Sequence, residues 1–168
     1  MTCVPLHFSG SEPQSVKSEY INPFIASTLE VFSTMLHCEL RRGELSLNDH
    51  FQPEYDVSGI IGLTGRASGT VVVSLESAVA CHAAHAMLGE MPDSVNADVI
   101  DVAGELTNMI AGKAKADLEQ LDMSLAIPTV ITGKNHLISF GSSAQTISIP
   151  YSCDWGKLSV EVGIVERG

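Results

Sequence analysis

The stretch VSGIIGLTGRASGTVVVSL, residues 57–75, contains two apolar runs separated by a glycine-rich segment. Both runs, 57–63 and 69–75, are rich in the β-branched and aliphatic residues that favour strands. The Gly65–Gly69 segment between them suits a tight turn, because glycine adopts backbone conformations that other residues avoid. It lacks the Lys-Ser/Thr pair of a phosphate-binding loop and opens no helix. We therefore expect a β-hairpin here and not a nucleotide site.

Helix signals lie on both sides of this hairpin. Asn22-Pro23 predicts a helix start, because asparagine is a strong N-cap and proline suits the first helical position. Downstream, Ser77 can cap a helix that Gly89 ends. We expect three helices, at about 22–37, 77–88 and 96–121, and the first of them buries Phe24, Leu29, Phe32 and Leu36.

Strand patterns fall into two groups around these helices. Clustered strands with short turns differ from the alternating strand–helix order of a parallel doubly wound sheet. The fold class is therefore α+β, a mostly antiparallel sheet with long helices packed on it. Besides the hairpin, we expect strands near 44–48, 127–132, 136–140, 144–149 and 158–165.

The composition of the 168-residue chain excludes several classes of protein. A hydrophobic share of 45% with 17% charged residues indicates a sizeable core and not a disordered chain. No apolar run approaches the roughly 18–20 residues that cross a bilayer. The net charge of -11 argues against nucleic acid and anionic membranes as partners. The chain begins with no secretory signal, and its four cysteines without a CxxC pair indicate reduced thiols in a cytoplasmic protein. We assign residues 1–19 to a loose arm and residues 20–168 to a single domain.

Residues 100–117, IDVAGELTNMIAGKAKAD, combine a buried helical stripe with an unusual polar face. The face consists of residues at spacings of four, three and four, which share one side of a helix: Asp101, Glu105, Asn108 and Gly112. Glycine inside a helix costs roughly 1 kcal/mol relative to alanine. Small residues nevertheless surround Asn108, which indicates a cleared contact surface; an ordinary solvated face is the alternative. These small neighbours are Gly104, Ala111 and Gly112.

A similar arrangement occurs in the first helix. Glu30 is followed three residues later by Ser33, as Glu105 is by Asn108. Each pair lies beside an aliphatic stripe and precedes a group of strands. This echo predicts two related halves, with Ser33 in the place of Asn108.

The chain offers few groups for catalysis on its own. His82 and His85 beside Cys81 have a spacing that could hold zinc, but their alanine-rich helix favours a packing role. Asn108 can orient a water molecule through its carboxamide, yet it is a poor general base near neutral pH. It makes sense where a partner supplies the electrophile and the metal. Glu105 could anchor that partner through a Lys or Arg.

The segment GELTNMIAGKAK, residues 104–115, resembles the signature helix of the CheC/CheX family of chemotaxis phosphatases, which act on the phosphorylated response regulator CheY. Further segments resemble the CheX type: NPF at 22–24, EVFSTML, SGIIGLTG, GTVVVSL, MLGE and IPTVITG. The similarity extends over about residues 20–165. The ExxN motif followed by MIAG is specific in this helical context.

The resemblance implies an enzyme that dephosphorylates the aspartyl phosphate of a CheY-like receiver domain. Asn108 would position the attacking water, and Glu105 would pair with a receiver lysine. The receiver would bring the divalent cation, usually Mg²⁺, so no metal or cofactor is expected on this chain. The residues expected to contact the receiver are Asp101, Gly104, Ala111 and Gly112.

The resemblance also implies a single active site and a dimer. CheX-type members carry one motif and CheC-type members two, so Glu30 and Ser33 are expected to be inactive. A homodimer through sheet edges is implied, with 144–149 and 158–165 as candidate strands. Two other hypotheses stay open: a non-catalytic module that binds a receiver through the same helix, and a small-molecule or metal sensor based on the two histidines.

Overall fold

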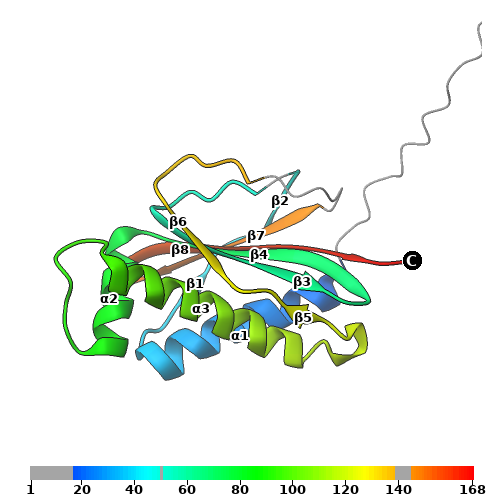
Figure 1. Cartoon of the computed structure of the whole chain (residues 1–168), viewed down its shortest axis with the longest axis horizontal. Coiled ribbons are helices and arrows are strands. Elements are labelled where there is room, and N and C mark those ends of the chain that lie inside the picture. Colours follow the sequence, from blue (N-terminus) through cyan, green and yellow to red (C-terminus); the bar gives the residue numbers. More distant parts are fainter. Residues whose placement is uncertain (1–16, 50, 139–144) are drawn as a thin grey trace, which may run out of the picture.

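The computed structural model describes residues 17–49, 51–138 and 145–168. Over these residues, eight strands form one sheet and three α-helices cover one of its faces (Figure 1). The helices are α1 (Ser18–Leu36), α2 (Ser77–Leu88) and α3 (Ala97–Ala116), and a short 3-10 helix, η1, covers Glu119–Leu121. The strands are β1 (Arg41–Arg42), β2 (Ser46–Asn48), β3 (Val57–Thr64), β4 (Ala67–Leu75), β5 (Ser124–Leu125), β6 (Thr129–Thr132), β7 (Thr146–Cys153) and β8 (Gly156–Glu166).

The sheet confirms the α+β class and the hairpin. The strand order is β1-β7-β8-β4-β3-β5, with β2 also pairing with β7 and β6 with β3, and each of these pairings is antiparallel. In the hairpin, Leu63 pairs with Gly69, and Gly65 and Arg66 connect β3 to β4. The turn is therefore shorter than the expected Gly65–Gly69 segment, because β4 already begins at Ala67.

The two predicted halves are visible in the order of the elements. In the described chain, α1 is followed by β1 to β4, and α3 is followed by β5 to β8. The short strands of each half pair with the long hairpin of the other half: β1 and β2 with β7, and β5 and β6 with β3. The long strands β4 and β8 pair with each other at the centre of the sheet (Figure 1). Both halves therefore contribute to one continuous sheet.

The start of α1 differs from the prediction. The helix begins at Ser18, so Asn22-Pro23 does not mark its start and Pro23 lies inside it. Proline has no N–H, so one hydrogen bond of the helix is missing. Burial compensates, because Tyr20 and Ile21, on the turn before the proline, are only 5% and 4% exposed. Packing against the core thus extends the helix beyond the local stop signal.

Asp56 caps α2 in place of Ser77. We expected Ser77 as the N-cap, but it is the first residue of the helix. Its backbone N–H and its hydroxyl donate hydrogen bonds to the Asp56 carboxylate, at 3.1 and 2.9 Å. Burial raises the pKa of Asp56, but these hydrogen bonds and nearby Lys134 outweigh it and lower the pKa overall. Gly89 ends the helix as predicted, with a left-handed φ of 88°.

Two predictions concern segments that the structure describes in part. Of the arm expected at 1–19, residues 1–16 lie outside the described residues, and Ser18 and Glu19 already belong to α1. Of the strand expected at 136–140, residues 139–140 lie outside them as well. The remainder forms no strand, because its only pairing is an isolated bridge between Ile138 and Phe51. The other expected strands correspond to β2, β6, β7 and β8.

The strands expected at the sheet edges do not lie there. Strand 158–165 corresponds to β8, which lies between β7 and β4 in the middle of the sheet. Strand 144–149 corresponds to β7, whose outer side pairs with β1 and β2; residue 144 itself lies outside the described residues. The edges of the described sheet are β1 with β2 on one side and β5 with β6 on the other. These pairings join strands far apart in the chain, so local sequence patterns could not reveal them.

Helix α3 packs closely on strand β3. Gly59 of β3 faces Thr107 and Ala103 of α3, and a side chain at position 59 would collide with the Thr107 hydroxyl. Thr107 is buried and donates a hydrogen bond to the Ala103 carbonyl at 2.8 Å. Leu106 and Ile110, on the same helix, are fully buried in the core. The close seating fixes which side of α3 faces outward.

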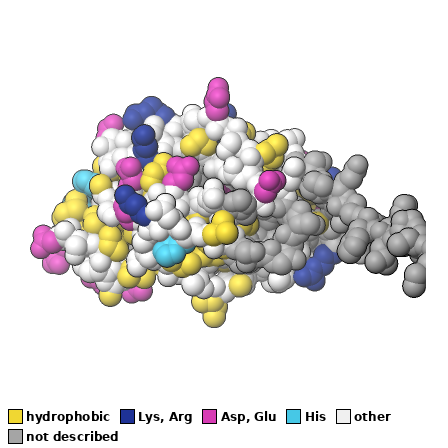
Figure 2. Space-filling view, turned by 90° about the horizontal axis from the view of Figure 1, so that it is seen from above, with side chains coloured by type: hydrophobic (Ala, Val, Ile, Leu, Met, Phe, Trp, Pro, Cys, Tyr) yellow, Lys and Arg dark blue, Asp and Glu magenta, His cyan; other side chains and the backbone are white. Residues whose placement is uncertain are grey.

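The side of the molecule away from the helices carries a mixed surface. Figure 2 shows acidic, basic and hydrophobic side chains interspersed over its described part. Lys134 and Asp56 form an ion pair at 3.5 Å. Among the described residues, no helix combines the length and the apolar character that a bilayer-spanning segment needs. The cysteines in the described part are free thiols, as expected: Cys38, Cys81 and Cys153.

Candidate functional site

A groove with a volume of about 510 Å³ lies between α3 and the segment that joins β5 to β6. The sequence predicted the polar residues of its helical wall and assigned no role to the opposite wall. The helical wall consists of Ile100, Asp101, Gly104, Glu105 and Asn108, and the opposite wall consists of Ala126, Ile127, Pro128 and Val130.

Helix α3 presents its polar face because its other side is fixed in the core. The helix starts beside Asn96, as predicted, but it ends at Ala116 and not near residue 121. The Asn96 side chain caps it by accepting a hydrogen bond from the Val99 N–H at 3.0 Å. A helical period of 3.6 residues then turns the polar face away from the sheet. Every member of the predicted apolar stripe is at most 4% exposed: Val99, Val102, Ala103, Leu106 and Ile110.

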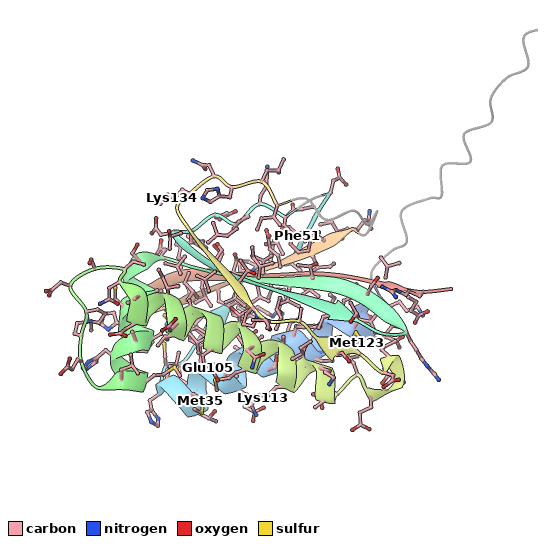
Figure 3. The ribbon with its side chains drawn as sticks, viewed as in Figure 1. Met35, Phe51, Glu105, Lys113, Met123 and Lys134 are labelled. Carbon is pink, nitrogen blue, oxygen red and sulfur yellow. The ribbon has the colours of Figure 1, made fainter. Side chains whose placement is uncertain are left out.

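Glu105 and Asn108 are available to a partner. Glu105 is exposed on α3 (Figure 3), and Asn108 is half-buried in the groove. Within the part of the chain that the structure describes, neither side chain takes part in a hydrogen bond or ion pair. The Asn108 carboxamide therefore keeps an acceptor and donors for a water molecule. Asp101, which is also exposed, lies one turn before Glu105 and makes this wall acidic.

The packing of α3 does not require Gly104 or Gly112. A methyl group at Gly104 would lie 3.4 Å from Val130 Cγ2, and one at Gly112 would lie 3.8 Å from Leu125 Cδ1. Both are ordinary contacts, so alanine would fit and would favour the helix by roughly 1 kcal/mol. Gly104 lines the groove, so an alanine at this position would reduce the space inside the groove.

The structure brings two of the four expected contact residues to the groove. Asp101 and Gly104 line it, as described above. Ala111 does not, because its methyl group is completely buried in the core and faces no partner. Gly112 is half-buried and lines a separate depression near η1.

Sequence reasoning missed the second wall of the groove. The 126–130 segment lies beside α3 because β5 and β6 both pair with β3, on which α3 packs. In the sequence this segment has the pattern of an ordinary strand. Pro128, which cannot donate a ladder hydrogen bond, is the one irregular feature that the sequence offers.

The equivalent residues of the first half have partners within the chain. The Glu30 carboxylate accepts a hydrogen bond from Lys113 Nζ at 2.8 Å. The Ser33 hydroxyl donates a hydrogen bond to Glu39 at 3.0 Å. Glu30 therefore differs from Glu105 in being paired within the chain. Ser33 differs from Asn108 both in its pairing and in its residue type.

The histidines of α2 do not form a metal cluster with their neighbours. The His82 ring stacks on Trp155, with centroids 5.1 Å apart and an interplanar angle of 8°. In the residues that the structure describes, no group of three or more His, Cys, Asp or Glu side chains could hold a metal ion. The structure therefore gives the metal-sensor hypothesis no support.

Comparisons with known proteins agree on one family. The family described as "Chemotaxis phosphatase CheX" matches residues 57–152. Over 125 residues the chain is 33% identical to the CheY-P phosphatase CheX of Thermotoga maritima. The matched region covers 72% of this chain and 81% of that protein. The structure is similar to that of the chemotaxis protein CheX from Vibrio vulnificus, with a TM-score of 0.81, 34% identity, and coverage of 88% of this chain and 100% of that one. It is also similar to a chain in the CheX–CheY–BeF3–Mg²⁺ complex from Borrelia burgdorferi, with a TM-score of 0.72, 25% identity, and coverage of 88% and 98%.

Proposed function

Because the chain belongs to the CheX family of chemotaxis phosphatases, we propose that it removes the phosphoryl group from the aspartate of a CheY-like receiver domain. The Thermotoga relative is named a CheY-P phosphatase, and the Borrelia neighbour was crystallised with CheY. One observation on this chain carries the proposal: Glu105 and Asn108 line the same groove, and neither side chain has a partner among the described residues.

In this proposal Asn108 holds the water that attacks phosphorus. Its carboxamide offers one acceptor and two N–H donors, and it need not transfer a proton. The new P–O bond forms to the water while the bond between phosphorus and the aspartyl oxygen breaks. The products are inorganic phosphate, which carries the protons of the water, and a free aspartate carboxylate. Such a phosphoryl transfer depends mainly on positioning and on stabilisation of charge.

Glu105 anchors the receiver through one of its lysine or arginine side chains. Its carboxylate is exposed, and Asp101 adds a second negative charge one turn away. The cation that neutralises charge on the phosphoryl group is Mg²⁺ held by the receiver, as the presence of Mg²⁺ in the Borrelia complex supports. This chain then contributes position and charge, and its partner contributes the metal and the electrophile.

Turnover of a panel of purified, phosphorylated receivers tests the proposal. Release of inorganic phosphate is followed with the native chain, with Asn108→Ala, and with Ser33→Ala as the matched control on α1. The native chain and Ser33→Ala are expected to accelerate release, and Asn108→Ala is expected to leave the receiver at its own rate with unchanged thermal unfolding. Full acceleration by Asn108→Ala would remove Asn108 from the mechanism.

A non-catalytic module that binds a receiver through α3 is the second candidate. The same exposed acidic wall, Asp101 and Glu105, favours it, because a docking surface needs no asparagine to position water. The phosphate-release assay separates the two candidates: tight binding to the phosphorylated receiver without faster release would support the module.

We also propose a homodimer, with the edge formed by β1 and β2 as the contact. Leu47 of β2 is 62% exposed and the preceding Leu45 is 44% exposed, so this edge carries uncovered apolar side chains. Sedimentation of the native chain and of Leu47→Lys tests it. A dimer that Leu47→Lys converts into a monomer is expected, and a native monomer at high concentration would contradict the proposal.

A further inference from the structure

The second wall of the groove contains a β-bulge. Strand β3 pairs Leu63 with Leu125 of β5 and Ile60 with Thr129 of β6. Two residues of β3, 61–62, therefore face three residues, 126–128, of the opposite segment. One extra residue in one of two paired strands defines a bulge, and bulges redirect side chains.

The bulge turns Ile127 outward over the groove. The Ala126 N–H donates a hydrogen bond to the Gly62 carbonyl at 2.9 Å, so the ladder holds the chain on one side of Ile127. Pro128 follows it with a fixed φ, and Thr129 resumes the ladder on the other side. Ile127 is 90% exposed, the most of any large hydrophobic residue that the structure describes.

The first half has the same bulge without this side chain. There Arg42 pairs with Tyr151 and Ser46 with Ser148, so three residues, 43–45, face two, 149–150. Gly43 donates to the Pro150 carbonyl as Ala126 does to that of Gly62, so Glu44 stands in the place of Ile127. The exposed Leu45 stands in the place of Pro128. The half that carries Asn108 is therefore also the half that carries an isoleucine at the bulge.

Resting on the proposed function, we infer that Ile127 is a specificity-determining contact that seats the receiver domain over the groove. The carboxylates of Asp101 and Glu105 on the helical wall would attract a cation, and Ile127 on the opposite wall would pack against an apolar surface. The partner that fits is a receiver that presents a lysine or arginine and, across the width of the groove, an apolar side chain beside its phosphorylated aspartate. Glu105 then orients the receiver, and burial of Ile127 holds it in place.

The anchored ends of the bulge make Ile127 suited to this contact. Ladder hydrogen bonds and a proline restrict the backbone on both sides of it. A backbone held in this way loses little conformational freedom on binding, so more of the gain from burial appears as affinity. Ile127 touches no reacting atom, and its effect is on how long and in which pose the receiver stays.

Steady-state hydrolysis with receivers that turn over tests the inference. Ile127→Ala is expected to raise KM on the order of ten-fold, as loss of one apolar contact at an interface does, while kcat stays within about two-fold. Ile127→Leu restores the apolar surface and is expected to restore KM. Leu137→Ala is the matched control, because Leu137 is an exposed leucine, at 65%, in the segment after β6 and outside the groove. An unchanged KM for Ile127→Ala, or an equal rise for Leu137→Ala, overturns the inference.

Failure of the Ile127 inference can be told apart from failure of the proposed phosphatase activity. If the native chain releases no phosphate, titration with the BeF3-loaded receiver replaces turnover, and Ile127→Ala is expected to weaken binding on the order of ten-fold. Turnover that depends on Asn108 but not on Ile127 overturns only the inference. A native chain that neither hydrolyses nor binds any receiver overturns both.

Discussion

Lys113 on α3 donates a hydrogen bond to the Glu30 carboxylate on α1, with Nζ and Oε1 2.8 Å apart. Glu30 holds in the first half the place that Glu105 holds in the second. The counterpart of the proposed anchor is thus tied to the helix of the other half. Both side chains are exposed, so the pair contributes at most about 1 kcal/mol to stability. Its main effect is that Glu30 does not offer a free carboxylate to a partner.

We predict that Ser33→Asn does not create a second active site. The substitution restores the asparagine, but Glu30 would have to leave Lys113 to pair with a receiver lysine, and the first half has no isoleucine at its bulge. In the Asn108→Ala background, Ser33→Asn is therefore expected to give no acceleration of phosphate release. Ser33→Ala in the same background is the control. Recovery of a substantial share of native turnover by the asparagine variant would show that the first half lacks only its asparagine.

Reversal of charge at Glu105 should weaken docking more than its removal. Glu105→Lys places a cation opposite the receiver cation, whereas Glu105→Gln only removes the attraction. We expect the affinity for the BeF3-loaded receiver to fall roughly ten-fold or more with lysine and less with glutamine, and the loss to shrink at high salt. Isothermal titration at two salt concentrations measures it. Glu119→Lys, at an exposed site on η1, is the control, and equal affinities for Glu105→Lys and the native chain would refute the anchoring role.

The substitution Gly104→Ala is predicted to stabilise the fold and to weaken the use of the receiver as a substrate. The methyl group fits against Val130, so Gly104→Ala should raise the free energy of unfolding by roughly 0.5–1 kcal/mol. It also enters the groove, so KM for the phosphorylated receiver should rise several-fold. Gly112→Ala is the matched control, because it gives the same helical gain outside the groove. Chemical unfolding and turnover assays read the two effects, and unchanged turnover with Gly104→Ala would show that the groove needs no glycine.

Glu161 is a buried acid on the central strand β8. It is 2% exposed and faces away from the helices, because its neighbours Val160 and Val162 belong to the core beneath them. Within the described residues its Oε2 atom has no hydrogen-bond partner. Burial raises its pKa to about 7; a hydrogen bond from the Gln52 backbone opposes the rise, and the charge of Glu54 adds to it. The folded chain therefore holds this proton more tightly than the unfolded chain, where the pKa is 4.5.

The stability of the protein should fall as this group ionises. The contribution of Glu161 to the free energy of unfolding is fully present below pH 4.5 and is lost as pH rises to about 7. Glu161→Gln keeps the shape without the titration, so at about pH 8 it should be the more stable chain by up to roughly 3 kcal/mol. At about pH 5 the difference should largely vanish. Chemical unfolding across this range measures it against Glu119→Gln, and a difference that is independent of pH would contradict the prediction.

Local sequence signals predict the features that neighbouring residues determine. The helix start near residue 96 follows from the local pattern, and the shared polar face of Glu105 and Asn108 follows from helical spacing; the structure contains both. The predicted helix start at Asn22-Pro23 was wrong, because burial of the residues before Pro23 outweighs this local signal. Ile127 could not be assigned a role, because it reaches the groove only through pairing of β5 and β6 with β3, a strand far earlier in the chain, as the partners Ile60 and Thr129 show.

The exchange of short strands between the halves has a consequence for how the site comes into being. A cut in the 89–96 connection between α2 and α3 would yield two pieces, each carrying the short strands that complete the other's sheet. The two pieces would have to assemble like subunits of an interlocked dimer. Both walls of the groove belong to the second piece, but β3, the strand on which both walls rest, belongs to the first. The half without the asparagine therefore supports the site that the other half carries.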